Sequence, residues 1–185
     1  MRRRSSRTQA YTEWVTQLLA NLDRSGPVGH ATVSYAQDTG MQVGIHSQSA
    51  GARWTPWNRV EMHPRYAEGP ADSPYALSLV VHEVWHLRQG WLTALSVYGE
   101  LDAWQRQFRF LESVTGPHRA EADRDRIIPK LMSLPLGWDR TVLRTARDLM
   151  QAYAGRNYRF DLLPLYPLHR ELLFVLTGRR PRRPA

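Results

Sequence analysis

Apolar residues in the first part of the chain recur with a helical period. Between residues 10 and 23 they lie three or four positions apart, the spacing of one face of an amphipathic helix. The residues on this face are Trp14, Val15, Leu18, Leu19 and Leu22. The sequence Ser25-Gly26-Pro27 ends the pattern, so we predict a first helix over residues 10–23.

From residue 30 to residue 63 the pattern changes to short β-prone runs. The runs are ATVSYA, MQVGIHS and NRVEMHP, and turn-forming residues separate them around residues 38–40 and 51–56. In the third run Val60 and Met62 alternate with polar residues, as they would in a strand with one exposed face. We therefore predict a small sheet whose strands are joined by hairpins.

Helical signals dominate the rest of the chain. Ser73 and Pro74 form a typical helix start and Gly90 a typical stop, which predicts a helix over residues 74–89. Further helices are predicted over residues 91–114, 118–132 and 139–154, with a short last helix near the C-terminus.

Length and composition are those of one packed domain. The chain has 185 residues, of which 42% are hydrophobic, enough for one core and few for two. We expect a single α+β domain over residues 1–185, with a short sheet beside a helical C-terminal part. No apolar run reaches membrane-spanning length, so we expect a cytoplasmic protein without a membrane partner. Cysteine is absent, so nitrogen and oxygen atoms must bind any metal.

The net charge of +8 is concentrated in two segments, residues 1–9 and 178–185. The arginines in these segments are Arg2, Arg3, Arg4, Arg7, Arg179, Arg180, Arg182 and Arg183. They equal the net charge in number, so the body between them is neutral. We expect both segments to be disordered, solvated tails. The alternative is that the tails bind nucleic acid.

Residues 81–90, VHEVWHLRQG, place two histidines four positions apart in the predicted helix. Side chains at this spacing project from one helix face, so the imidazoles of His82 and His86 can converge on one metal ion. Glu83 is rotated away by one position. It can hydrogen-bond a metal-bound water without binding the metal, which is the arrangement of H-E-x-x-H hydrolases.

The residues around this motif are apolar on nearly all sides of the helix, which indicates that the helix is buried. A buried imidazole or carboxylate costs roughly a few kcal/mol unless it is paired, and a bound cation would offset that cost. The alternative is structural: two core histidines satisfied by hydrogen bonds and a glutamate in an ion pair.

A catalytic zinc usually has three protein ligands, and two downstream glutamates are candidates for the third. Glu100, in YGELDAWQ, is far enough from the motif for a helix that turns back across the first. Gly99 and Ala103 beside it are small enough to let the two backbones approach. Glu121, in HRAEADRD, is the alternative, with Asp125 one turn beyond it.

HEVWH followed by a helical glutamate resembles the gluzincin class of zinc metallopeptidases, particularly its minimal single-domain members. These families commonly have alanine three residues after the ligand glutamate, which Glu100 matches and Glu121 does not. The resemblance covers about residues 74–107. It implies a zincin-like fold, a peptide or protein substrate, Glu83 as general base and acid, and zinc bound by His82, His86 and Glu100.

One position departs from the thermolysin-like members of the class, in which an aspartate one turn after the ligand glutamate orients a histidine. Trp104 has that place after Glu100, whereas Asp125 has it after Glu121, so both glutamates remain candidates. Such sites also use a second donor to stabilise the oxyanion. The candidates for it are Tyr98, His118 and Tyr158.

The strand predicted at NRVEMHP stands where peptidases of this class have the sheet edge that binds an extended substrate, although an ordinary edge strand has the same pattern. We therefore expect a zinc metallopeptidase. Two alternatives remain: a catalytically inactive zinc-binding or structural relic of that fold that acts through a protein partner, and a nucleic-acid-associated protein that binds through its arginine-rich tails.

Overall fold

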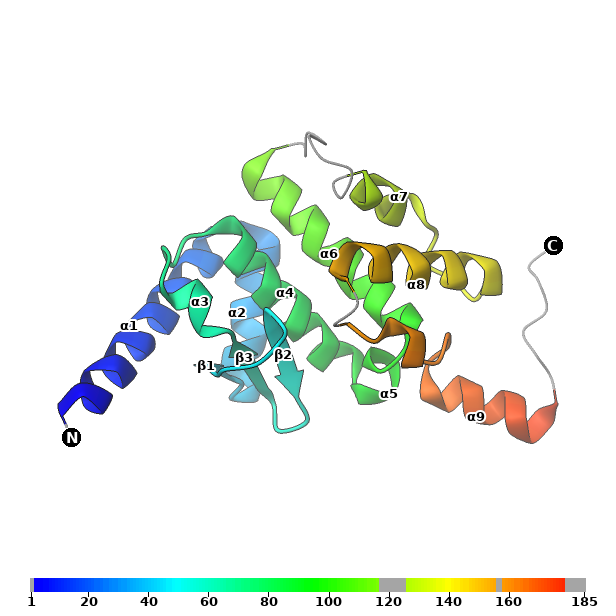
Figure 1. Cartoon of the computed structure of the whole chain (residues 1–185), viewed down its shortest axis with the longest axis horizontal. Coiled ribbons are helices and arrows are strands. Elements are labelled where there is room, and N and C mark those ends of the chain that lie inside the picture. The colour runs from blue at the N-terminus through cyan, green and yellow to red at the C-terminus, as the bar shows by residue number, and fades with distance from the viewer. Residues whose placement is uncertain (1, 117–125, 156–157, 179–185) are drawn as a thin grey trace.

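The computed structural model describes residues 2–116, 126–155 and 158–178. Within them the chain is α+β, mostly helical with one three-stranded sheet (Figure 1). The first half contains the helices α1 (Arg2–Arg24), α2 (Pro27–Thr39) and α3 (Pro64–Ala67) and the strands β1 (Gln42–Ile45), β2 (Ala52–Thr55) and β3 (Arg59–Met62). The second half contains the helices α4 (Pro74–Gln89), α5 (Trp91–Ala94), α6 (Val97–Thr115), α7 (Ile127–Ser133), α8 (Arg140–Ala154), the 3-10 turn η1 (Phe160–Leu162) and α9 (Leu168–Thr177).

The first helix is longer than its apolar face. α1 includes residues 2–9, which were expected to form a disordered tail, and that prediction is wrong. Side chains four positions apart connect its successive turns: Arg7 donates to the Tyr11 hydroxyl (2.8 Å) and Gln9 donates to Glu13 (3.0 Å). Such pairs stabilise a helical extension once the packed part of the helix has formed its nucleus.

α2 occupies the segment ATVSYA that was predicted to be a strand. Pro27 stands in its first turn, where the missing N–H costs no hydrogen bond, and Gly40 ends it in the left-handed conformation (φ 66°). The buried residues Thr32, Val33 and Ala36 recur at helical spacing. The β propensity of this segment is a weak preference, and packing of α2 against α1 and α4 overrides it.

The sheet has the order β1-β3-β2, with β1 parallel and β2 antiparallel to β3. The strands predicted at MQVGIHS and NRVEMHP are confirmed. β2 was predicted to be a loop, and it forms a hairpin with β3 alone. The predicted hairpin between β1 and β3 is wrong, because the chain passes through β2 before it returns to pair with β1. β3 is therefore central, and it cannot be the substrate-binding edge; β2 is the edge strand beside α4.

Burial of β3 also differs from the alternating pattern. Val60, Glu61 and Met62 are all buried, because the strand lies between two others and packs beneath α4. The Glu61 carboxylate is paired with the Arg53 guanidinium on β2 at 2.6 Å, which compensates for its burial. The prediction of a half-exposed strand is therefore wrong.

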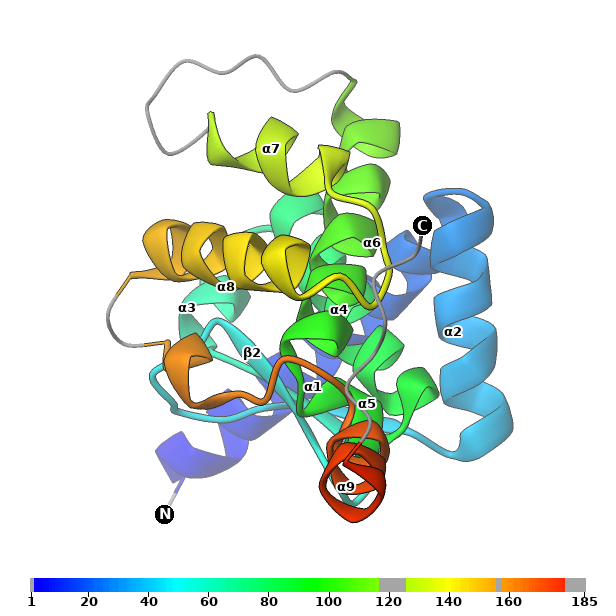
Figure 2. The same cartoon turned by 90° about the vertical axis from the view of Figure 1, so that its right-hand side faces the viewer.

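α4 begins and ends where the sequence predicts, at Pro74 and before Gly90. Every residue from Ala76 to Val84 is buried, because α4 packs against α2 and the sheet on one side and against α6 on another. Figures 1 and 2 show α4 and α6 at the centre of the molecule, with α7 and α8 beyond α6. The two helices that carry the predicted ligands are therefore neighbours in the core.

The predicted helix over residues 91–114 is divided in two. α5 ends after one turn, and α6 starts anew at Ser96, whose hydroxyl accepts the Gly99 N–H at 3.0 Å. A Cβ atom on Gly99 would overlap the carbonyl oxygen of Thr93. At Gly99 the close approach is thus between α6 and α5, while Ala103 is fully buried in α6, which packs closely against α4 as predicted.

The C-terminal part contains the remaining helices. Asp139 caps α8 by accepting the N–H groups of Thr141 and Val142, which agrees with the predicted helix over residues 139–154. Of the helix predicted over 118–132 the structure describes α7, and most of the rest lies outside the described residues. Of the tail over 178–185 it describes only Gly178. No described helix is long and apolar enough to span a membrane.

Candidate metal centre

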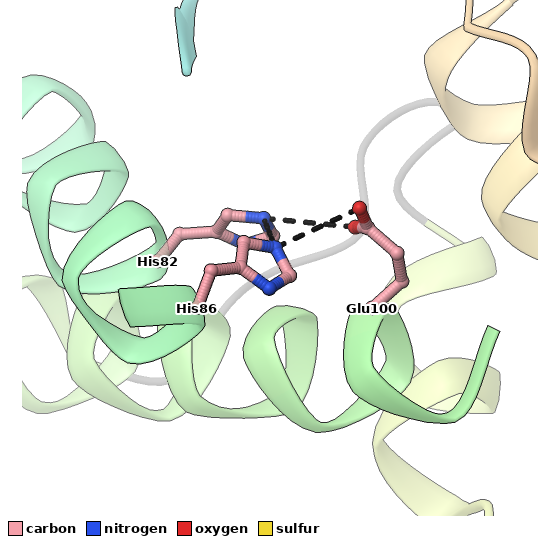
Figure 3. A group of neighbouring side chains, drawn as sticks. All are labelled: His82, His86 and Glu100. Carbon is pink, nitrogen blue, oxygen red and sulfur yellow. Dashed lines mark hydrogen bonds and ion pairs between the residues drawn. The ribbon is translucent and has the colours of Figure 1, made fainter. Parts of the chain in front are cut away.

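The structure brings together the two histidines of α4 and one glutamate of α6. The Nε2 atoms of His82 and His86 are 3.0 Å apart. The carboxylate of Glu100 in the first turn of α6 lies 3.7 Å from His82 Nε2 and 3.6 Å from His86 Nε2 (Figure 3). All three side chains point into the space between the two helices. One ligand atom from each residue lies within 4.8 Å of the others, so the group could hold a metal ion.

The spacing can be compared with that of a real coordination shell. Zinc bound to nitrogen or oxygen at about 2.1 Å with tetrahedral angles separates its ligand atoms by about 3.4 Å. Here the two imidazole nitrogens are 3.0 Å apart, Glu100 Oε2 lies 3.7 Å from His82 Nε2, and the other oxygen, Oε1, lies 3.6 Å from His86 Nε2. Small side-chain rotations would therefore accommodate an ion of this size. Glu121, the alternative third ligand, lies outside the described residues, as does its neighbour Asp125.

The electrostatics of the three groups follow from their burial. Burial, and to a lesser extent the nearby His86, lowers the pKa of His82 to about 3, so the His82 imidazole is neutral. Burial also opposes a charge on His86, but the Glu100 carboxylate outweighs it and raises the pKa of His86. Burial raises the pKa of Glu100, but both histidines lower it. The net result is a decrease in the pKa of Glu100. In the metal-free protein, His86 and Glu100 thus form a buried ion pair beside a neutral His82.

The outer nitrogen of His86 is oriented by a hydrogen-bonded chain. The Asp102 carboxylate only accepts hydrogen bonds, so it fixes the amide of Gln89, whose Nε2 donates to it at 2.8 Å. The oxygen of that amide then faces His86 Nδ1 at 3.2 Å and requires a hydrogen there. The Trp85 indole N–H also donates to Asp102, at 2.6 Å. The lone pair of the neutral imidazole is therefore on Nε2, where a metal would bind.

The surroundings of His82 are different. Its Nδ1 atom is buried, and the Gln107 side chain and the Ala103 backbone are the groups beside it that can hydrogen-bond the ring. Trp104 stands where thermolysin-like enzymes have an orienting aspartate; its ring faces the His82 ring edge-on at 6.3 Å, and its side chain hydrogen-bonds Glu100.

Glu83 lies beside the ligand group and outside it. Its Oε2 accepts the backbone N–H of Trp54 on β2 at 2.8 Å. The pKa of Glu83 is raised to about 7, chiefly by burial; His86 opposes this rise and Glu100 adds to it. Sequence reasoning did not identify Trp54, because β2 was not predicted and a backbone N–H leaves no trace in residue type.

These side chains line a cavity of about 530 Å³. Its other walls are largely aromatic, and they come from β2, α3, α4, α6, α8 and η1. Tyr158 is the candidate oxyanion donor that lines the cavity; its hydroxyl accepts the Gly51 N–H at 3.3 Å. Tyr98 stacks on Trp138 instead, with ring centroids 4.5 Å apart, and does not line the cavity. His118 lies outside the described residues.

Comparisons with protein-family models, with curated proteins and with solved structures find no match to this chain.

Proposed function

We propose that this protein is a zinc-dependent hydrolase of the gluzincin type, acting as a metallopeptidase, with a zincin-like fold. The observation that carries the proposal is the position of Glu100, whose carboxylate lies within 3.7 Å of both imidazoles while Glu83 stands beside them. Two imidazoles and one carboxylate are the ligand set of many catalytic zinc sites, which keep a further position open, and zinc would displace the proton that His86 carries in the metal-free protein.

The donor set fits zinc. It contains two imidazoles, an oxygen and no thiolate, and the outer nitrogen of His86 is held by Gln89 in the manner of a zinc ligand. When bound, zinc would supply Lewis acidity that activates water and polarises a substrate carbonyl. His82, His86 and Glu100, which line the cavity, would hold it.

In this proposal Glu83 moves the protons. The N–H of Trp54 holds one carboxylate oxygen in place, and the described residues offer no hydrogen bond to the other oxygen. A carboxylate with a pKa near neutrality can accept a proton from the attacking water and donate it to the leaving amine. Removal of that carboxylate should abolish turnover and leave the ligands intact.

The substrate would lie along β2. β2 is paired with β3 along one edge, and no described strand is paired with its other edge. Three of its residues, Ala52, Arg53 and Trp54, line the cavity. An extended peptide placed there would bring its carbonyl groups past the proposed metal position. Tyr158, whose hydroxyl lies next to the start of β2, is our candidate for the second donor to the oxyanion.

Elemental analysis of the purified protein tests the proposal. We expect about one zinc per chain, lost in His82→Ala and in His86→Ala and retained in Glu83→Gln. A protein that is metal-free and takes up no added zinc would overturn it.

Cleavage of a mixed peptide library is the second measurement. Wild type should release peptides and Glu83→Gln should not. Zinc retention without cleavage by the wild type would instead support an inactive relic that binds a partner.

A further inference from the structure

The last described helix is unusual because none of its residues is buried. Four of the ten large apolar side chains that are exposed in the described part of the chain belong to α9, and Val175 and Leu176 are both 80% exposed. The other two are Leu172 and Leu173. Phe174 attaches the helix to the body by packing on Tyr166, with ring centroids 5.3 Å apart. Exposed leucines and valines in such a group mark an interaction surface.

Two more apolar side chains lie next to this helix. α5 contacts α9, and Figures 1 and 2 show the two helices together at one end of the molecule. Trp91 in α5 is 58% exposed, and Leu95 directly after it is 41% exposed. We refer to these six residues as the C-terminal apolar patch: Trp91, Leu95, Leu172, Leu173, Val175 and Leu176.

The sequence around the patch is strongly basic. Arg170 lies in α9, and Arg179, Arg180, Arg182 and Arg183 follow the helix within a few positions. The only acidic residue from Leu168 to the last residue is Glu171. Its carboxylate accepts the Tyr166 N–H at 3.4 Å and is half-buried, and its single negative charge offsets only one of the five arginines.

We propose that the C-terminal apolar patch and the arginines that follow it bind the protein to the surface of an anionic lipid membrane. The aliphatic side chains of α9 would enter the boundary between headgroups and acyl chains, and the indole of Trp91 suits the same depth. The arginines would contact lipid phosphates. Apolar insertion and a polybasic segment are each weak alone and bind stably together.

The charge near the patch favours an anionic membrane over a second copy of the chain as its binding partner. Two copies joined through the patch would bring their arginine segments together, and like charges repel. An anionic surface attracts the same segment. The earlier expectation of no membrane partner rests on the absence of a spanning segment, and binding at the surface requires none.

Co-sedimentation of the full-length protein with lipid vesicles tests the proposal. We expect binding to vesicles of phosphatidylcholine mixed with phosphatidylglycerol and little binding to phosphatidylcholine alone. Leu172→Ser and Leu176→Ser should each weaken binding roughly tenfold, because an exposed leucine loses its transfer energy. Leu136→Ser is the matched control: Leu136 is also exposed, lies outside the patch and should have no effect.

Two charge variants distinguish the effect of the arginines next to the patch from the effect of the net charge of the protein. Replacement of Arg179, Arg180, Arg182 and Arg183 by Gln should weaken binding by at least about a hundredfold, at roughly fivefold per arginine. The same replacement of Arg2, Arg3, Arg4 and Arg7 changes the net charge equally and should leave binding nearly unchanged.

Three results would overturn the proposal. They are no binding to anionic vesicles, equal loss in the two arginine variants, and a stable dimer in sedimentation velocity that Leu172→Ser dissolves.

Discussion

Replacement of Glu83 by glutamine should change how the stability of the metal-free protein depends on pH. Burial raises the pKa of Glu83 from 4.5 to about 7 in the fold. Between these values the carboxyl is protonated in the folded protein and ionised in the unfolded chain, so unfolding releases a proton. Stability therefore falls as pH rises through this window and levels off above the folded pKa. With a pKa of 4.5 in the unfolded chain and about 7 in the folded protein, the free energy of unfolding should fall by about 2–3 kcal/mol between about pH 5 and about pH 8.

Other groups at the site titrate as well, and the variant serves as their reference. The raised pKa of His86 gives stability that is also lost with rising pH, and this loss remains largely in Glu83→Gln. Denaturant unfolding in the presence of a chelator should show that wild type loses about 2–3 kcal/mol more than the variant between about pH 5 and about pH 8. Parallel curves for the two proteins would refute the reasoning. Added zinc should stabilise wild type most at the higher pH, where its ligands are deprotonated.

Four further variants probe the site and its support. Glu100→Ala should weaken zinc binding by more than about a hundredfold in a competition titration, whereas Glu121→Ala should not; the reverse result would make Glu121 the third ligand. Gln89→Leu should weaken zinc binding about 10–100-fold because it removes the partner of a ligand imidazole, and an unchanged affinity would show that this contact is incidental. Gly99→Ala should lower the unfolding free energy by at least about 2 kcal/mol, because its Cβ would overlap the backbone of Thr93; wild-type thermal stability would contradict the packing described.

The helices were predictable where a local signal marks both ends. Pro74 and Gly90 bound α4, and each acts through its own backbone geometry without help from distant residues. α2 carried the same kind of signal in Pro27 and Gly40, yet its β-branched residues favoured the strand interpretation. Side-chain propensity was the weaker of the two signals, because burial against α1 and α4 decides the conformation of this segment.

The sheet was less predictable because pairing is a long-range property. The alternation in a strand shows which faces are buried and does not show which strand is its neighbour. β1 pairs in parallel with β3 and the intervening β2 lies on the far side, an order that no turn signal specifies. β3, the strand expected to bind substrate, is therefore the central strand. The edge strand beside the site is β2, which was predicted to be a loop.

The residues of the site also differ in whether local or long-range structure fixes their positions. His82, Glu83 and His86 follow from the period of one helix, because their relative positions are fixed once that helix forms. Glu100 required α6 to pack back across α4, and the sequence could only narrow that choice to two glutamates. Gln89 and Asp102 are polar residues that the sequence displays openly, three positions after the second histidine and two after Glu100. Their role appears only when both helices are placed, because one side chain must meet the other to fix the amide between them. The orientation of a ligand is thus a property of the helix pair, and it cannot be read from either helix alone.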